Sequence, residues 1–408
     1  MKILTVHIFF SPFGGGEVIA YNTYKLFQKM GHKSYFFATD KKPFFENDYE
    51  YLNYFPKYEK SILSFIRKPY NYYWNPEAKN SFRKMLEVVK PDVVHIHGIK
   101  WLTYSILDAC VELNIPVVQT IHDASMVCPV STLLLNNKHY CKDFKCKSGN
   151  YYNCLFHNCS KAGIEGSFRN ALFDFIALKT NSYKKISKFV TPSIALKNLI
   201  VDANIGIQEN KIAVVNNFLE NQYINTEVDY KNKGYFLYSG RLSQEKGVHY
   251  LLEAIKELPR DINFHIVGTG PEEECYKTYI EKNKLTNVKM CGFMGRDELL
   301  SEYRYCIAGI HPCNWFENFP TSIMEFFALG KPVIGSDIGG ISEQIEHNET
   351  GFLFKPANIS QLKKYILKYW KDPQLSILHG KKARQKTINI YNEKRYYDQI
   401  MSLYKNLI

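Results

Sequence analysis

Short apolar runs alternate with amphipathic stretches along most of this chain. One series of apolar runs lies within residues 1–218 and a second within residues 234–385. In the first series we predict strands at Lys2–Phe9, Ser34–Ala38, Asp92–Ile96, Pro116–Ile121, Lys188–Thr191 and Ile212–Val215. In the second we predict strands at Tyr235–Ser239, Ile262–Val267, Asn287–Cys291, Cys306–His311, Pro332–Gly335 and Gly351–Phe354. Helical patterns separate them, among them Glu17–Met30, Trp101–Leu113, Val248–Glu257, Glu272–Asn283, Asp297–Tyr305 and Ser322–Leu329. Since strands that alternate with helices form parallel sheets covered on both faces, we expect an α/β protein with two doubly wound domains.

The remaining segments define the connections. Residues 219–233 are polar and show no clear periodicity, which is typical of a linker. Residues 386–408 are expected to form a last helix that packs back on the first domain, with self-association as the alternative. Its apolar stripe consists of Tyr396, Tyr397, Ile400, Leu403, Tyr404 and Leu407. Ligands of doubly wound sheets bind at the carboxyl ends of the strands, so the pattern predicts a site in a cleft where two such sheets face each other.

Composition and charge bear on whether the chain is a membrane protein, a secreted protein or a nucleic-acid-binding protein. The chain has 408 residues, a hydrophobic fraction of 45% and no apolar stretch near the roughly 18 residues of a membrane span. The apolar start Ile3–Phe10 is short and runs into a glycine turn, so it indicates a first strand rather than a signal peptide, and we expect a cytoplasmic protein. The formal charge of +12 suits anionic ligands. No signature of a nucleic-acid-binding module accompanies it, so no nucleic acid is expected as a partner.

A basic, aromatic segment at residues 57–84 has two interpretations. Its basic residues are Lys57, Lys60, Arg67, Lys68, Lys79, Arg83 and Lys84, and its aromatic residues are Tyr58, Phe65, Tyr70, Tyr72, Tyr73, Trp74 and Phe82. Such a mixture suits peripheral contact with an anionic membrane, here the inner face. A solvated loop and helix face explains it equally well.

The run Glu317–Glu325 is the most informative motif. It places two carboxylates eight positions apart, one before a helix and one inside it. Pro320 suits the first position of that helix, and Gly330 ends it before the next buried strand. Free backbone N–H groups at a helix start bind phosphate, while carboxylates accept hydrogen bonds from sugar hydroxyls. The run therefore predicts a site for a phosphorylated sugar compound.

Glycine-rich turns follow several predicted strands. Gly14, Gly15 and Gly16 follow the first strand without forming the GxGxxG dinucleotide fingerprint. Arg241 and Lys246 lie in a turn after the first strand of the second domain, where two cations suit a diphosphate. Two further turns of this kind are Val267–Pro271 and Ser336–Ile341.

Taken together, these motifs resemble the retaining GT-B glycosyltransferases of family 4. The resemblance covers the second domain in order and spacing, and the first domain more loosely; Pro320 stands where many members carry Gly. It implies a GT-B fold of two Rossmann-like domains and a donor that is a UDP-sugar or GDP-sugar, with no other cofactor. It also implies that Arg241 and Lys246 neutralise the donor diphosphate, that Glu317 contacts the sugar and that Glu325 contacts the ribose. Further donor contacts implied by it are Gly14, Gly15, Gly16, Gly268, Phe293, Met294, Phe319, Pro320 and Thr321. The sequence has no Asp-x-Asp motif, so we expect metal-independent transfer and no catalytic metal site.

Histidines close two strands of the first domain. His122 matches a family position near the donor sugar and the acceptor hydroxyl, and we assign it to catalysis over a purely structural role. His95 and His97 end the preceding strand. We expect His97 to line the cleft and His95 to lie in the core.

Five of the 10 cysteines cluster after His122, at Cys128, Cys141, Cys146, Cys154 and Cys159. Two C-x4-C pairs can hold zinc, although this is not a standard zinc spacing. A cysteine- and tyrosine-rich loop that shapes the acceptor pocket is the alternative.

The sequence thus predicts a transferase that moves a sugar to a glycan or lipid-linked acceptor, as in cell-surface polysaccharide synthesis. A nucleotide-sugar epimerase of the same fold and a noncatalytic nucleotide-sugar-binding subunit are the alternatives. The sequence names neither the sugar, the base nor the acceptor.

Overall fold

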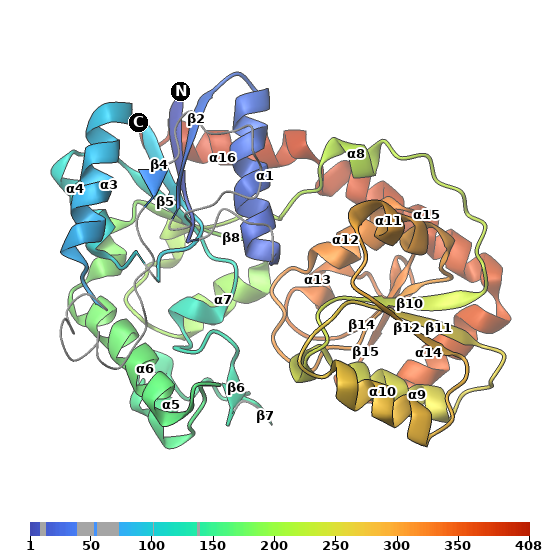
Figure 1. Cartoon of the computed structure of the whole chain (residues 1–408). Coiled ribbons are helices and arrows are strands. Elements are labelled where there is room, and N and C mark those ends of the chain that lie inside the picture. Colours follow the sequence, from blue (N-terminus) through green and yellow to red (C-terminus); the bar gives the residue numbers. More distant parts are fainter. Residues whose placement is uncertain (9–13, 39–52, 55–72, 101, 137–138) are drawn as a thin grey trace. The chain divides into compact units, whose positions relative to one another are not determined.

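The structure is a computed structural model that describes residues 1–8, 14–38, 53–54, 73–100, 102–136 and 139–408 (Figure 1). The chain divides into two compact units. The first consists of Met1–Asn216 and Lys394–Ile408, and the second of Asn217–Glu393. The corresponding predicted boundaries are residues 218 and 386.

The first unit is built on a parallel seven-stranded sheet in the order β3-β2-β1-β4-β5-β8-β9. Its strands are β1 (Lys2–Val6), β2 (Lys33–Ala38), β3 (Asn53–Tyr54), β4 (Val93–Ile96), β5 (Val117–Thr120), β8 (Lys188–Thr191) and β9 (Ile212–Val214). Its main helices are α1 (Gly15–Lys29), α3 (Pro76–Val89), α4 (Ser105–Glu112), α6 (Gly163–Lys179) and α7 (Ile194–Asp202). The prediction of a doubly wound domain is confirmed.

Two boundaries of the first unit differ from the prediction by more than two residues. β1 ends at Val6 instead of Phe9, and Phe9 itself lies outside the described residues. α4 begins at Ser105 instead of Trp101, because Thr103 has a φ of 59° and cannot continue a right-handed helix.

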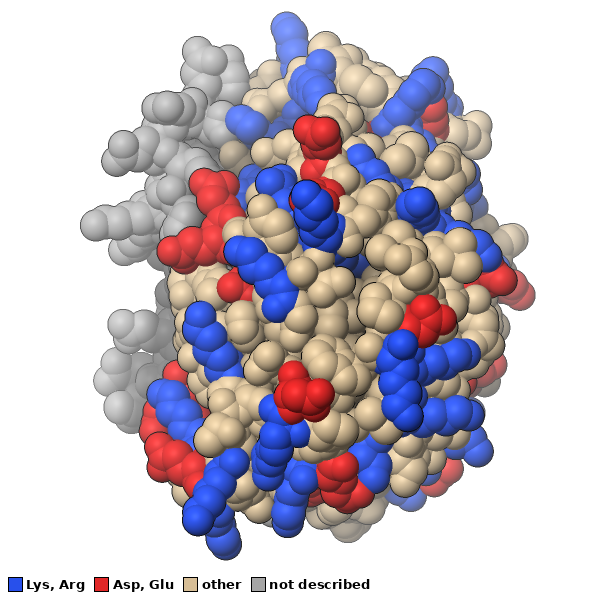
Figure 2. Space-filling model, turned by 90° about the vertical axis from the view of Figure 1, so that its right-hand side faces the viewer, with Lys and Arg blue, Asp and Glu red and all other residues tan. Residues whose placement is uncertain are grey.

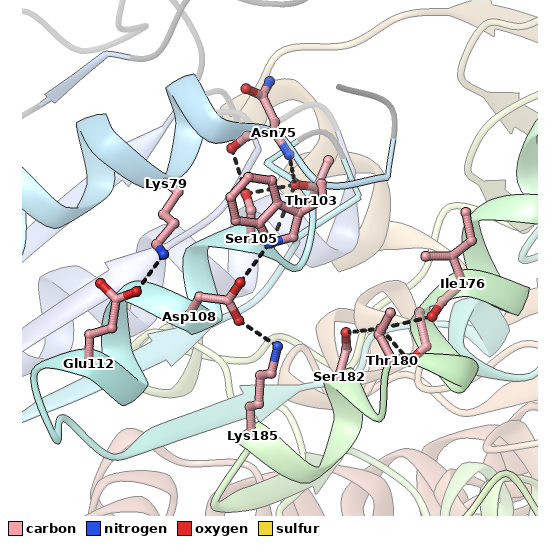
Figure 3. Close-up of polar contacts among 12 residues, drawn as sticks. Asn75, Lys79, Thr103, Ser105, Asp108, Glu112, Ile176, Thr180, Ser182 and Lys185 are labelled. Carbon is pink, nitrogen blue, oxygen red and sulfur yellow. Dashed lines mark hydrogen bonds and ion pairs between the residues drawn. The ribbon is translucent and has the colours of Figure 1, made fainter. Parts of the chain in front are cut away.

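Polar contacts join α3 to α4 (Figure 3). The Asn75 side chain caps α3 by accepting from the N–H groups of Glu77 and Ala78, at 3.0 and 3.1 Å. The backbone N–H of Asn75 donates to Thr103 Oγ1 at 3.0 Å, and Ser105 Oγ donates to the Asn75 carbonyl at 2.8 Å. These bonds fix the start of one helix against the start of the next.

The basic segment 57–84 is described only from Tyr73 onward; residues 57–72 lie outside the described part. In that part Lys79 and Arg83 form ion pairs with Glu112 of α4, and Phe82 is completely buried. Figure 3 shows the Lys79–Glu112 pair between the two helices. These contacts support the interpretation of residues 73–84 as a helix face.

The end of the chain forms two helices, α15 (Pro373–Ile390) and α16 (Glu393–Lys405), where the sequence predicted one helix from residue 386. α16 packs on the first unit through its tyrosines. Tyr396 Oη lies 2.9 Å from Thr23 Oγ1, and Tyr404 Oη lies 2.6 Å from His95 Nδ1. The Tyr404 ring also packs on Phe27 of α1.

The second unit has a parallel six-stranded sheet in the order β12-β11-β10-β13-β14-β15. Its strands are β10 (Tyr235–Ser239), β11 (Asn263–Val267), β12 (Val288–Gly292), β13 (Gly309–His311), β14 (Val333–Ser336) and β15 (Gly351–Phe354). The main helices are α9 (Val248–Lys256), α10 (Glu273–Lys282), α11 (Arg296–Tyr305), α12 (Thr321–Ala328) and α14 (Ile359–Lys371). The strand order reverses between β10 and β13, which is where such sheets bind ligands.

An insert separates β5 from α6 in the first unit. It contains a small antiparallel pair, β6 (Leu134–Leu135) and β7 (His139–Tyr140), and the short helix α5 (Tyr152–Phe156). It also carries the five clustered cysteines.

Among the described residues, no helix has both the length and the apolar composition needed to cross a bilayer. Figure 2 shows lysine and arginine side chains spread over the visible face, with acidic side chains among them. The positive charge on that face is therefore distributed and does not form one stripe.

Candidate active site in the second unit

Lys246 and Glu317 form an ion pair at the switch point of the second sheet. Lys246 ends a short 3-10 turn (Gln244–Lys246) that follows β10, and Glu317 lies in the loop between β13 and α12. Lys246 Nζ lies 2.5 Å from Glu317 Oε2, and the two side chains are 21% and 15% exposed. The adjacent strands β10 and β13 thus bring together two residues that are 71 positions apart.

Trp315 and the glycine turn after β14 also contact Glu317, one at its carboxylate and the other at its backbone. Trp315 Nε1–H donates to Oε2 at 2.8 Å, and the Lys246 ammonium lies 5.2 Å from the centre of the Trp315 ring. The backbone carbonyl of Glu317 accepts from the N–H of Gly340 at 2.8 Å. The glycine turn after β14 therefore fixes the loop that carries this carboxylate.

Charge at this site favours the ionised pair. Burial alone raises the pKa of Glu317, but Lys246 and His311 outweigh it and the pKa is lowered. Burial lowers the pKa of Lys246, but Glu317 outweighs it and the pKa is raised. Both residues are therefore charged at neutral pH.

His311, Cys313 and Glu317 form a group that the sequence analysis did not identify. One ligand atom of each lies within 4.8 Å of the others, and His311 Nε2 is 4.0 Å from Glu317 Oε2. Such a group could hold a metal ion, but Lys246 already neutralises Oε2 and an ion would compete with it. Burial lowers the pKa of His311 to about 4, so its imidazole is neutral near pH 7.

The helix after Glu317 begins at Thr321, one residue before the predicted range Ser322–Leu329, and Pro320 precedes it instead of being its first residue. Pro320 is the N-cap, with φ −63° and ψ 126°, and Thr321 is the first residue of α12. The Pro320 carbonyl accepts from Gln344 Nε2 at 3.1 Å, while Phe319 is buried and its carbonyl accepts from Asn217 Nδ2 at 3.4 Å. The helix leaves its first N–H groups without intrahelical acceptors, next to Glu317.

Glu325 lies on α12 within a chain of hydrogen bonds. Tyr303 Oη donates to Glu325 Oε2 at 2.8 Å, and Ser239 Oγ lies 2.8 Å from the same tyrosine oxygen. Ser239 ends β10, so this chain links the carboxylate to the sheet. Burial raises the pKa of Glu325 despite the hydrogen bond from Tyr303.

The remaining predicted residues of the second unit surround the ends of β10–β12. Arg241 is exposed in the turn after β10. Gly268 packs against Gly240, since a Cβ at Gly268 would lie 1.9 Å from the Gly240 carbonyl oxygen. In the turn after β12, Phe293 is 81% exposed, whereas Met294 packs against the core of the unit.

In the first unit, the structure brings the glycine turn next to His122. Gly14 is the N-cap of α1, and a Cβ at Gly16 would lie 3.3 Å from the His122 ring. His97 Nδ1 lies 2.9 Å from His122 Nε2, and the two rings stack at 5.1 Å. His97 is only 5% exposed, and burial lowers the pKa of His122 to about 3.

Sequence reasoning missed His311, Trp315 and Tyr303. Trp315 lies two residues before Glu317, and this closeness in sequence was the only sign that the two side chains interact. Tyr303 lies on α11, 22 residues before the carboxylate that it contacts, and no local pattern links the two.

Comparison with known proteins agrees with this fold. The family model for glycosyl transferases group 1 matches residues 220–389, and the model for glycosyltransferase family 4 matches residues 13–222. An uncharacterized glycosyltransferase of Methanocaldococcus jannaschii is 28% identical over 229 residues, covering 56% of this chain and 61% of the relative. A putative teichuronic acid biosynthesis glycosyltransferase of Bacillus subtilis, TuaC, is 31% identical over 133 residues, covering 33% of this chain and 32% of the relative.

A solved structure matches over the whole length. The crystal structure of HepE of Anabaena in complex with UDP-glucose has a TM-score of 0.73 and 19% identity, and 100% of each chain is covered. At that identity the likeness shows the fold alone. Together with the two family models, which span residues 13–389, it confirms the predicted fold: this chain belongs to the GT-B glycosyltransferases.

Proposed function

We propose that this chain is a retaining, metal-independent hexosyltransferase that uses a nucleotide-diphosphate sugar in cell-surface polysaccharide synthesis. The observation that carries the proposal is the Lys246–Glu317 ion pair at the switch point of the second sheet. A cation beside a carboxylate suits a ligand in which a diphosphate adjoins sugar hydroxyls. Retention of configuration rests on the family resemblance.

The diphosphate is the leaving group, and negative charge develops on it in the transition state. Lys246 and the exposed Arg241 are the cations that stabilise it, with the backbone N–H groups at the start of α12 beside them. A charge-assisted hydrogen bond of this kind contributes about 1.5–3 kcal/mol. These fixed positive charges can neutralise the diphosphate, which a bound metal ion does in other transferases.

The two carboxylates have separate roles in this proposal. Glu317 accepts hydrogen bonds from hydroxyls of the donor sugar, and Glu325 accepts from the ribose. Gly268, Phe293 and Met294, in the turns after β11 and β12, are assigned to the base. The complex of HepE with UDP-glucose supports a UDP-sugar as the donor, with a GDP-sugar as the alternative.

The first unit provides the acceptor side. His122, which is next to Gly16, is assigned to the reacting hydroxyl, and Gly14 and Gly15 to backbone contacts with the donor phosphates. The similarity to TuaC, described as a teichuronic acid biosynthesis glycosyltransferase, supports a glycan or lipid-linked acceptor.

A donor screen followed by an acceptor assay tests the proposal. A true donor at 100 times its dissociation constant should stabilise the fold by about 2.7 kcal/mol. With a pool of lipid-linked glycans, nucleoside diphosphate release should rise well above the rate without acceptor, and it should persist in EDTA. Interconversion of sugars without any acceptor would indicate an epimerase, and tight donor binding without turnover would indicate a binding subunit.

We also propose that the enzyme acts in the cytoplasm at the inner face of the membrane. The basic segment 57–84 motivates this location, although its contacts from residue 73 onward are internal. Flotation with anionic liposomes should weaken as salt rises, since screening shortens the reach of surface charge. Absent or salt-insensitive flotation would contradict the proposal.

A further inference from the structure

Five thiols converge on one small cavity in the insert of the first unit. Cys128, Cys141, Cys146, Cys154 and Cys159 all line it, together with apolar side chains such as Leu134. All five are free thiols, and all except Cys146 are buried. The cavity has a volume of about 20 Å³, which is room for one small ion or one water.

Backbone N–H groups point at four of these sulfurs. Leu133 and Val130 donate to Cys128, Lys145 to Cys141, Cys154 to Cys146 and Asn136 to Cys159. Donors of this kind stabilise thiolates and orient them as metal ligands. A loop that merely shaped a pocket would not need such donors at four separate sulfurs.

The fifth thiol has a different role. The Cys154 thiol donates a hydrogen bond to the Cys159 sulfur, so it acts as a partner of Cys159 and is set apart from the other four thiols. Two lysines lie beside the cluster: Lys145 lines the cavity, and Lys100 Nζ donates to the Pro129 carbonyl and to Ser131 Oγ.

The backbone of the insert is held in costly conformations. Ser131, Leu133, Asn136, Phe144, Ser148 and Asn158 all have positive φ without being glycine. Residues other than glycine are strained in this region, asparagine least among them. Among its described residues, the regular elements of the insert are β6, β7, α5 and two three-residue 3-10 turns, so few regular hydrogen bonds hold these conformations.

We propose that the insert binds one Zn²⁺ ion through Cys128, Cys141, Cys146 and Cys159 as a structural site. A tetrathiolate set is the preferred environment for structural zinc. The sulfurs must move closer on binding, since no three of them lie within 4.8 Å of one another among the described residues. His139 and His157 do not line the cavity, so the ligands are all sulfur.

Metal analysis of the untagged full-length protein, purified under reducing conditions, tests the site. We expect about one zinc per chain, bound by a site that adds stability, as structural zinc sites do. Removal of zinc by a chelator should lower the melting temperature, and added Zn²⁺ should restore it. Cobalt should replace zinc and give the intense sulfur-to-cobalt charge-transfer absorption of a thiolate site.

Matched variants identify the ligands. Cys146→Ser and Cys159→Ser should each lose most of the zinc, with affinity falling at least tenfold. Cys154→Ser should retain it. Cys275→Ser, an exposed thiol of the second unit, is the control and should match the parent chain. Cys313→Ser tests the His311–Cys313–Glu317 group and should also retain zinc.

Several results would overturn the proposal. Zinc near zero in the parent protein, with no response of its melting temperature to added Zn²⁺, would remove the site, and this measurement needs no variant to fold. Iron in place of zinc, a Cys154–Cys159 disulfide in metal-free protein, or loss of zinc in Cys313→Ser alone would each contradict it.

Discussion

Lys246 Nζ lies 2.5 Å from Glu317 Oε2, so the cation assigned to the donor diphosphate is held by the carboxylate assigned to the donor sugar. Each residue fixes the charge state of the other, because the pKa of Glu317 is lowered and that of Lys246 is raised. The pair is thus ready to bind a ligand without first gaining or losing a proton.

Lys246→Ala should lower kcat/KM by about 10²–10³, since it removes the positive charge that we propose stabilises the leaving group. Glu317→Ala should cause a loss of the same order through the sugar contacts. Initial rates with the donor found in the screen give the measurement, and Lys256→Ala, an exposed lysine of α9, is the control. Activity within a factor of two of the parent chain, with unchanged melting, would refute the assigned roles.

Glu325→Gln should raise stability at neutral pH while weakening donor binding. Burial raises the folded-state pKa of Glu325, so the folded protein favours its protonated form. The stability tied to this group is fully present below the unfolded pKa and is lost as pH rises through the folded pKa. Glutamine has no charge to bury and keeps an acceptor for Tyr303 Oη. The melting temperature of the parent chain should therefore fall more between pH 4.5 and pH 8 than that of Glu325→Gln. A variant that is less stable than the parent chain at pH 8 would contradict this prediction.

The sequence predicted the sheets well because buried parallel strands are continuous apolar runs. β10 and β15 have the predicted bounds, β11 begins one residue later than predicted, and β12 and β14 are each shifted by one residue at both ends. The short β3, β6 and β7 were not predicted, since two residues carry no periodicity. The predicted start of α4 was wrong because the left-handed conformation of Thr103 cannot be recognised from the pattern of apolar and polar residues.

At the candidate site, the residues that directly follow strands could be predicted from the sequence, but the side chains that contact them could not. Arg241, Lys246 and Glu317 stand at strand ends, where chemistry is expected in this fold. Tyr303 and His311 contact the two carboxylates through tertiary structure, and neither carries a local motif. Contacts of that kind depend on the register of neighbouring strands and helices, which one sequence does not reveal.

Acid should destabilise the fold through His95. This residue is fully buried between Thr120 and Tyr404, and burial lowers its pKa to about 3. Its unfolded-state pKa is near 6.5, so its stability contribution is complete above that value and falls as the pH drops. Between pH 6.5 and 5 the loss reaches about 2 kcal/mol, because the unfolded chain alone takes up the proton. The free energy of unfolding in urea, measured at pH 6.5 and at pH 5, gives this loss. His95→Gln should reduce the difference, whereas His139→Gln, at an exposed position, should leave it unchanged.

Asp108→Asn should loosen the packing of α4. Asp108 accepts from Trp74 Nε1 through one oxygen at 2.6 Å and pairs with Lys185 Nζ through the other at 2.5 Å. Figure 3 shows the pair with Lys185 next to the α3–α4 contacts. Loss of the charge should cost about 1 kcal/mol, since the groups are partly exposed. Chemical unfolding checks this, with Asp143→Asn of the exposed insert surface as the control; equal stabilities would refute it.

Gly268→Ala should be far more damaging than Gly292→Ala, although both glycines have positive φ, at 129° and 70°. At Gly268 a Cβ would lie 1.9 Å from the Gly240 carbonyl oxygen, whereas at Gly292 no atom lies within 4 Å. Gly292→Ala should therefore cost only the backbone strain, about 1–2 kcal/mol. Gly268→Ala must also push β10 and β11 apart at the proposed donor site, and should cost more than about 3 kcal/mol. Urea unfolding of the two variants separates backbone strain from steric conflict. Equal losses would show that the ends of β10 and β11 are not packed as tightly as this structure places them.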